Sequence, residues 1–540
     1  MIVGLNASSF CQQSIVEFWP NGNKSAEGTY NIVGRENGKW LYYYEKGPLK
    51  EEMNYFNGVP HGRAQYFFEN GKPQDLGYFY YGKADSIKTS WHPNGHKKEE
   101  GYYNKGYKDS IWTIWYTHGK IMQTQNFFPE ITLLVDYYDE QGNQLVKKGE
   151  GKTIVKFSNG NIKEESTYRQ GLKNGTSHTY YNDGQKKATG MFKDNLKHGQ
   201  WQEWHQNGKQ KLLAEFNNGK LNGAYNEWFD TGIQWKSFSY VIDSLDGLSK
   251  QWFDNGTVNF EGTYLIGVKQ GKWNWYYRNG NNDMEGEFKN GLQHGHWIFY
   301  FKEKGKEYEG EFVEGKKHGQ WKYYYPDGKL WKEGGFANDM KNGYWVYLFE
   351  NGKKVQEGNF IDDKEEGSWV SWYDNGQKKD EGSYIGGKMN GKWKGWFKDG
   401  KINYEGTCKN DIKHGPWVFY NFLGKITEQG SYNEAVKEGF WISNYDTGIT
   451  ESEGKYANGK PEGVWKYYFE TGQKFQVQTF KKGLLDGKSI SYHKVPGEVM
   501  RSLTTFKNGM AEGSWIFYDK KGEIIKKSQY KNGIEISVTK

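Results

Sequence analysis

The fold is encoded in a short stretch, Trp321–Phe336, which reads WKYYYPDGKLWKEGGF. Aromatic residues stand on both sides of the sequence Pro326–Gly328. Aromatic side chains favour β-strands, and Asp-Gly pairs favour the positive φ angles of tight hairpin turns. The stretch therefore predicts one β-hairpin.

This hairpin recurs with a period of 24 residues. We number each repeat from position 0, the place of Trp321, and the same interval separates Trp273, Trp297, Trp321, Trp345, Trp369, Trp393, Trp417, Trp441 and Trp465. A short connection such as Asn338–Gly343 joins each hairpin to the next. Such self-similarity is typical of arrays in which each repeat packs only on its neighbours. We expect an all-β fold, an elongated, twisted, single-layer antiparallel meander of about 21 stacked hairpins.

The register of the repeat divides the chain into four segments. Residues 1–30 supply a partial N-terminal repeat or cap, residues 31–134 a first block, residues 135–152 a degenerate junction, and residues 153–540 a second block with a C-terminal cap. Asp136 and Glu150 stand in the junction where the pattern places aromatic residues. They predict a kink between the two blocks.

The composition favours a thin sheet over a conventional globule. Only 35% of the residues are hydrophobic, the mean hydropathy is −0.99, and the aromatic fraction alone is 18%. Aliphatic residues are too few for a deep core, yet the many aromatic rings exclude a disordered chain. The net charge of +7 is spread over 73 basic and 66 acidic residues, so no stripe for nucleic acid is expected.

Location and redox state follow from equally simple features. No apolar run of about 18 residues predicts a membrane span, and Met1–Trp19 lacks the charge and apolar stretch of a signal peptide. We therefore expect a cytoplasmic protein. Cys11 and Cys408 lie far apart in an elongated chain, so no disulfide is predicted.

The alternation of side chains predicts two different faces. If positions +6 and +7 form the hairpin loop, position 0 lies opposite position +13, and positions 0, +4, +13 and +15 share one face. Position +13 is usually Gly, so we expect Trp321 to cover Gly334. Tyr324, at +3, belongs to the other face with Lys and Glu. A Gly bulge in Pro326–Gly328 would shift this register.

Candidate metal ligands recur with the repeat. Histidines stand three residues before position 0, where other repeats have Asn, Asp or Glu, at His61, His198, His294, His318 and His414. This exchange pattern predicts a turn position. Successive hairpins lie about 10 Å apart, too far for the ligands of one metal ion, and the close pair His294 and His296 makes at most half a site.

Glutamates form a second column at position +12, at Glu261, Glu285, Glu309, Glu333, Glu357, Glu381 and Glu405. Their spacing excludes a shared calcium ion and predicts pairing with lysines such as Lys329, Lys353 and Lys401. Residues Gly483–Ser489 resemble a phosphate-binding loop but are one residue too short. We expect no catalytic, cofactor or metal site, and hence not an enzyme.

These columns carry a family resemblance. The segment Glu285–Tyr300, EGEFKNGLQHGHWIFY, resembles the MORN repeat variant, and the resemblance extends over residues 20–535. It implies a hairpin ribbon that acts in scaffolding, dimerisation or phospholipid contact. Bacterial proteins built mainly of this variant are labelled YwqK-like antitoxins, which implies that the partner is a toxin protein.

Together these features predict a non-enzymatic repeat scaffold that binds a protein partner along an extended, aromatic-rich surface. The partner is expected to be a toxin or a second copy, and not nucleic acid or a small-molecule substrate. A peripheral membrane scaffold that contacts phospholipid is one alternative, because aromatic and Lys side chains suit that interface. A carbohydrate-binding aromatic groove is the other.

Overall fold

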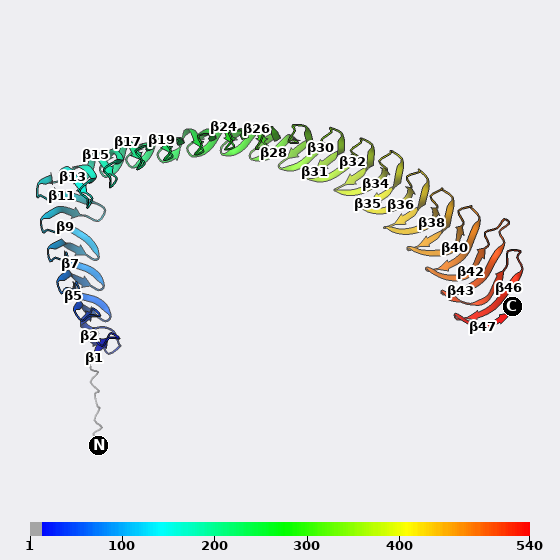
Figure 1. Cartoon of the computed structure of the whole chain (residues 1–540), viewed down its shortest axis with the longest axis horizontal. Helices are drawn as coiled ribbons and strands as arrows, with labels where there is room; N and C mark the ends of the chain where they lie inside the picture. The colour runs from blue at the N-terminus through cyan, green and yellow to red at the C-terminus, as the bar shows by residue number, and fades with distance from the viewer. Residues whose placement is uncertain (1–12, 540) are drawn as a thin grey trace, which may run out of the picture. The chain divides into compact units, whose positions relative to one another are not determined.

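The computed structural model describes residues 13–539, and within that range the secondary structure consists of 47 β-strands without a helix. The chain divides into two compact units, one ending at Val268 and the other beginning at Lys269. Within each unit the hairpins follow one another in chain order (Figure 1). The predicted all-β architecture of hairpin repeats is confirmed.

The first unit contains the strands up to β23. They are β1 (Gln13–Phe18), β2 (Lys24–Tyr30), β3 (Gly38–Tyr43), β4 (Leu49–Phe56), β5 (Val59–Phe67), β6 (Pro73–Tyr80), β7 (Lys83–Trp91), β8 (Lys97–Asn104), β9 (Tyr107–Trp115), β10 (Ile121–Phe127), β11 (Thr132–Tyr138), β12 (Gln144–Lys147), β13 (Glu150–Lys156), β14 (Ile162–Arg169), β15 (Leu172–Tyr180), β16 (Lys186–Lys193), β17 (Leu196–Trp204), β18 (Gln210–Asn217), β19 (Lys220–Trp228), β20 (Gln234–Val241), β21 (Ser244–Leu245), β22 (Gly247–Trp252) and β23 (Val258–Leu265).

The second unit contains the remaining strands, the first of which begins at the boundary. They are β24 (Val268–Tyr276), β25 (Asn282–Lys289), β26 (Leu292–Tyr300), β27 (Lys306–Val313), β28 (Lys316–Tyr324), β29 (Leu330–Ala337), β30 (Met340–Leu348), β31 (Lys354–Ile361), β32 (Lys364–Trp372), β33 (Lys378–Ile385), β34 (Lys388–Trp396), β35 (Ile402–Lys409), β36 (Ile412–Tyr420), β37 (Ile426–Asn433), β38 (Val436–Asn444), β39 (Thr450–Ala457), β40 (Lys460–Tyr468), β41 (Lys474–Lys481), β42 (Leu484–Tyr492), β43 (Met500–Lys507), β44 (Met510–Ala511), β45 (Gly513–Tyr518), β46 (Ile524–Lys531) and β47 (Ile534–Thr539).

The hairpin loop of a regular repeat has three residues, not the predicted two, and the loop between β42 and β43 is longer. In the β28–β29 hairpin the amide of Gly328 donates to the Tyr325 carbonyl (2.9 Å), and the amide of Tyr325 donates to the Lys329 carbonyl (2.8 Å). Gly328 has a φ of 88°, so the loop is a turn that ends in a left-handed Gly bulge. The predicted two-residue loop is wrong, because the Asp-Gly pair forms the end of a longer turn.

A second irregularity nevertheless restores the predicted register. Tyr324 lies opposite Leu330, whereas Tyr323 lies opposite Lys332, so Trp331 is an extra residue in β29. The two shifts compensate, and Trp321 lies opposite Gly334 as predicted. The assignment of positions 0 and +13 to one face is therefore confirmed.

The connection to the next hairpin is a two-residue turn. Asn338 and Asp339 have φ values of 51° and 71°, as a type I′ turn requires, and Ala337 pairs with Met340 across it. Asn342, at position −3, therefore lies within β30 and not in the turn. The prediction that the −3 column, with its five histidines, is a turn position is wrong.

The core is a row of Trp rings, each seated on a glycine of the preceding repeat. A Cβ atom on Gly310 would lie 2.2 Å from Cδ2 of Trp321, and one on Gly334 would lie equally close to Cδ2 of Trp345. The Trp321 indole also donates to the carbonyl of Glu311 (3.2 Å). The prediction that Trp321 covers Gly334 is wrong, because the ring leans toward the preceding hairpin and covers Gly310.

The degenerate junction has its own small core. Leu134, Tyr137 and Val146 are buried together between β11 and β12. Asp136 and Glu150 replace ring packing with hydrogen bonds, since their carboxylates accept the backbone amides of Lys148 (3.0 Å) and Gln170 (2.9 Å) respectively. Both acidic residues therefore satisfy turn amides in this segment, and the kink stays a prediction.

Candidate interaction surfaces

The aromatic face is closed by side chains of the repeats themselves. Trp321 is completely buried, although the sheet has a single layer. The ring of Phe312 packs edge-on at a centroid distance of 5.1 Å, Phe336 packs at 6.0 Å, and the Lys317 ammonium lies 4.3 Å from the indole centroid. The Trp rings are thus core residues and are not themselves accessible to a partner.

Position −3 ties a repeat to the turn that follows it in many places along the chain. The Glu438 carboxylate accepts the backbone amide of Asn458 (2.8 Å), which opens the following two-residue turn. The equivalent bond joins the Glu366 carboxylate to the backbone amide of Gly386 (2.7 Å), and in both cases the two residues are 20 positions apart. His61 fills this place with Nδ1 3.4 Å from the Tyr81 amide. In these repeats the exchange among acidic residues and His keeps a hydrogen-bond acceptor, whereas Asn342 donates to the Asp362 carboxylate (3.4 Å) and the buried Nδ1 of His198 has no hydrogen-bond partner.

Replacing Glu438 with Ala should destabilise the turn at Asn458 by about 1 kcal/mol, because the turn amide loses its acceptor. Hydrogen exchange in a peptide spanning residues 451–463 measures the effect. Glu438→Gln keeps a side-chain oxygen and should change exchange much less. Equal acceleration by both substitutions would show that the bond does not hold the turn.

The opposite face carries the glutamate column, paired differently from the prediction. Its carboxylates form ion pairs with lysines at positions +9 and +1, namely Lys306–Glu309 (2.8 Å), Lys378–Glu381 (2.8 Å), Lys250–Glu261 (2.9 Å) and Lys394–Glu405 (3.7 Å). The predicted lysines lie elsewhere, since Lys329 and Lys401 pair with Asp327 and Asp399 and Lys353 donates to the Asn375 carbonyl. They stand beside the Gly bulge, at the loop end of the hairpin.

Tyrosines at position +3 complete this ladder. Tyr420 donates to Glu405 (2.8 Å), Tyr300 donates to Glu285 (2.5 Å), and Tyr324 donates to Glu309, each bond reaching back to the preceding repeat. The placement of Tyr324 with Lys and Glu is confirmed. The glutamates are structural ties between hairpins.

The pH dependence of one such tie can be predicted. The pKa of Glu453 is held below its ordinary value of 4.5, chiefly by a hydrogen bond from Lys466 (2.9 Å). Burial raises this pKa, and a second hydrogen bond, from Tyr468 (2.8 Å), lowers it. A lowered folded-state pKa stabilises the protein above pH 4.5, and this stabilisation is lost as the pH falls through the lower folded value. Glu453→Gln should therefore cost up to about 1 kcal/mol at pH 7, and this cost should shrink as the pH falls below 4.5, as measured by local hydrogen exchange. A cost that does not change with pH would contradict the assignment.

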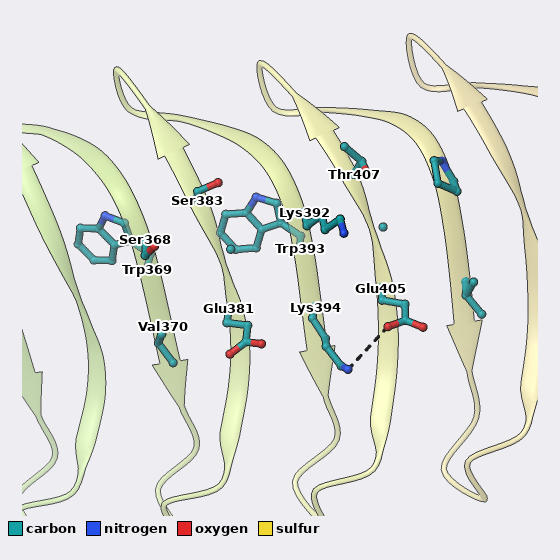
Figure 2. Close-up of a pocket in the computed structure, with 14 residues that line it drawn as sticks. Ser368, Trp369, Val370, Glu381, Ser383, Lys392, Trp393, Lys394, Glu405 and Thr407 are labelled. Atoms are coloured by element: carbon teal, nitrogen blue, oxygen red, sulfur yellow. Dashed lines mark ion pairs between the residues drawn. The ribbon is translucent and has the colours of Figure 1, made fainter.

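A depression of about 670 Å³ interrupts this face in the second unit (Figure 2). Small side chains from three adjacent repeats leave the space, among them Ser368, Ser383 and Thr407, and the Lys394–Glu405 ion pair lies at its side. The Ser383 hydroxyl is engaged with the Asn390 carbonyl. The depression thus offers polar contacts to a ligand.

A row of exposed apolar side chains borders the same face at the two-residue turns. We call it the turn-edge row, and in the second unit it consists of Leu292, Val313, Met340, Ile361, Ile385, Ile412, Val436, Leu484 and Met510. These side chains are between 39% and 60% exposed. Most of them face a lysine across the turn, as in Val313–Lys316 and Ile361–Lys364. The positions, −5 and +16, look like ordinary strand ends in the sequence, which is why sequence reasoning missed them.

The remaining sequence candidates do not converge on a reaction centre. Cys408 is a buried thiol in the core, where burial raises its pKa, and Cys11 lies outside the described residues. Gly483–Ser489 forms part of a turn and of β42, as its repeat position predicts. Between residues 13 and 539 no group of three His, Cys, Asp or Glu side chains could hold a metal ion, and no helix there could cross a membrane.

Known proteins resemble the chain mainly through the repeat. The MORN repeat variant family matches residues 36–57, 60–79, 245–265, 317–338, 365–385, 389–410, 461–482 and 511–532. No curated protein matches the chain in sequence.

Solved structures of toxin complexes align with most of the chain at low identity. The crystal structure of TcdB2-TccC3-Cdc42 shares 10% identity over 96% of this chain and 28% of that chain, with a TM-score of 0.14. The Tc holotoxin pore of Photorhabdus luminescens, with a TccC3 mutation, shares 9% identity over 96% of this chain and 32% of that chain, with a TM-score of 0.13. The chain thus spans about a third of these proteins, and scores this low do not establish a shared fold. What the comparisons establish is that eight segments of this chain match the MORN repeat variant.

Proposed function

We propose that the chain is a non-enzymatic repeat scaffold that binds a protein partner along the turn-edge row of its second unit. The observation that carries the proposal is the row itself. Its members recur in repeat after repeat at a spacing of about 10 Å, and each exposes roughly half of an apolar side chain. Many weak contacts of this kind add up to useful affinity when a partner spans several repeats.

The charges along the row favour a protein over a membrane surface. Lysines such as Lys316, Lys364 and Lys388 flank the turns, but the turns themselves carry acidic residues, including Glu314, Asp362 and Asp363. Strong capture by anionic lipid needs clusters of about four to eight basic residues without such neutralisation. A protein partner can instead bury the apolar side chains and match the alternating charges.

The resemblance to YwqK-like antitoxins suggests that the partner is a toxin. The same family resemblance also suggests a second copy of the chain as the partner. A peripheral membrane scaffold is a second candidate function. It is favoured by the apolar–lysine pairs across the turns, such as Ile361–Lys364 and Lys409–Ile412.

Two matched double variants test the proposal. Ile361→Ser with Ile385→Ser removes part of the row, while Phe440→Ser with Val464→Ser removes equally exposed side chains from position −1 of the same face. We expect a partner recovered by pull-down from the native source to be lost from the first variant and retained by the second.

Co-sedimentation with anionic vesicles at low and physiological salt runs beside the pull-down. Vesicle binding at physiological salt that depends on Ile361 and Ile385, with no protein partner, would replace the proposal with the membrane scaffold. Retention of the same partner by both variants would exclude the turn edge as the binding surface. Light scattering of the purified chain shows whether the partner is a second copy.

A further inference from the structure

The lysines at position −4 lie over the aromatic core, and several of them have a fixed counterion. Lys108 lies 3.7 Å from the Trp112 ring centroid and 3.1 Å from the carboxylate of Glu99, which is at position +11 of the preceding repeat. The pairs Lys173–Glu164 and Lys437–Glu428 repeat the arrangement. These repeats thus place a glutamate at +11 to neutralise a half-buried ammonium.

In a few repeats position +11 carries a lysine and not a glutamate. In the repeat that begins at Trp321, position +11 is Lys332, and the −4 lysine of the next repeat is Lys341. Lys332 lies directly opposite Tyr323 of β28 on one side and Tyr347 of β30 on the other. A lysine therefore occupies the position from which other repeats supply a carboxylate.

Three ammonium groups gather at this site, which we call the lysine triad, Lys317, Lys332 and Lys341. Lys332 Nζ lies 4.5 Å from the centroid of the Tyr323 ring. Lys317 Nζ is 3.2 Å from the Tyr323 hydroxyl, and Lys341 Nζ is 2.9 Å from the Tyr347 hydroxyl. All three lysines are partly buried. The triad thus presents a dense set of hydrogen-bond donors.

The triad has no carboxylate of its own within ion-pair distance in residues 13–539. Lysines at +11 elsewhere do, since Lys236 pairs with Glu227 (3.1 Å) and Lys526 pairs with Glu535 (3.4 Å). Burial lowers the pKa of Lys332, and the charges of Lys341 and Lys317 lower it further. Asp339 opposes the effect of burial on the pKa of Lys317, yet its Oδ1 accepts that residue's backbone amide (2.8 Å). Unpaired, partly desolvated ammonium groups favour an anion from outside.

We propose that the lysine triad binds side-chain carboxylates of an acidic peptide segment. A carboxylate is the group that Glu99 and Glu428 place among the same lysine and aromatic columns in other repeats. Met340 of the turn-edge row immediately precedes Lys341, so a partner that wraps this edge reaches the triad. Assigning the peptide to a partner protein rests on the proposed function, whereas the anion site rests on its own geometry.

Lys332→Glu is the sharpest test, because it introduces the carboxylate that Glu99 and Glu428 supply at this position in their own repeats. The probe is a fluorescently labelled hexaglutamate peptide, whose binding to the full chain is followed by anisotropy at low salt. We expect the substitution to weaken binding by about tenfold or more, while Lys379→Glu, the same charge change at an exposed lysine two repeats further on, changes it less than about twofold. Lys332→Glu should also raise the local resistance to hydrogen exchange, which shows that lost binding is not lost folding.

Equal peptide affinity for the wild type and Lys332→Glu would overturn the proposal. Binding of inorganic phosphate or of phosphatidylserine vesicles through Lys332, with no binding of the peptide, would overturn it as well. The edge variant Ile361→Ser with Ile385→Ser separates the two proposals. If the edge variant keeps the native partner and only Lys332→Glu loses the peptide, the proposed function is wrong and the triad stands. If the edge variant loses the partner and Lys332→Glu keeps its affinity for the peptide, the triad is wrong and the turn edge stands.

Discussion

Replacing Gly310 with Ala should destabilise the hairpins around it by about 3 kcal/mol, one of the largest effects of any single methyl group in this chain. The added Cβ would lie 2.2 Å from Cδ2 of Trp321, whose ring is fully buried and has no space to retreat. Hydrogen exchange of peptides from β27 and β28 measures the local free energy of opening, which suits a repeat array better than a global melt.

Gly77→Ala is the matched control for this prediction. Gly77 occupies the same +13 position, but the next position 0 is Lys88, whose Cγ would lie 3.8 Å from the new Cβ. The substitution should therefore change the stability of its own hairpins by less than about 0.5 kcal/mol. Similar costs at Gly77 and Gly310 would mean that the Trp ring does not set the requirement for glycine.

Trp321→Ala should cost about 3–5 kcal/mol in the same measurement. The change removes a fully buried ring, its edge-on contacts with Phe312 and Phe336, and the cover over Gly310. Lys322→Ala, its neighbour on the opposite face, should cost less than about 0.5 kcal/mol. If the two substitutions had equal effects, the division of the sheet into a core face and an outer face would be wrong.

The architecture could be predicted from the sequence because the period is unbroken over many repeats. Hairpin repeats are predicted by three features together, which are the fixed interval of 24 residues, the aromatic runs and the turns that end in Gly. The pairing of Trp321 with Gly334 also emerged, although two compensating shifts, at Gly328 and Trp331, produce it. Periodicity records the net register of a hairpin and not the individual irregularities.

The lean of the Trp rings was missed, yet the sequence contains the signal. Trp40 and Trp465 are followed at +13 by Met53 and Gln478, which are not glycines, whereas Gly28 and Gly454 precede them and lie under their rings. Position +13 is therefore matched to the next repeat's position 0. The prediction assumed that a Trp covers the glycine of its own hairpin. Each such glycine lies between two Trp residues, as Gly334 does between Trp321 and Trp345, so the ladder alone does not show which ring covers it.

The surfaces could not be predicted in the same way. The exposure of side chains at positions −5 and +16 depends on where the two-residue turn closes. An irregularity near residues such as Gly343 shifts the register of the strand, so counting residues along the strand does not show where the turn closes. The lysine triad escapes a search for motifs because it spans two repeats. It becomes visible only once Lys332 is placed opposite Tyr347 and compared with Glu428 at the same position.

The central claim is that a buried Trp at position 0, such as Trp321, occupies the space left by the missing side chain of a glycine in the preceding repeat. A double-mutant cycle between Gly310→Ala and Trp321→Ala tests it most directly. With the ring removed, the added methyl group should cost almost nothing, giving a coupling energy of about 2–3 kcal/mol. The same cycle between Gly334→Ala and Trp321→Ala should be additive within about 0.5 kcal/mol, because Gly334 lies under Trp345. Additivity at Gly310, or strong coupling at Gly334 alone, would contradict the account.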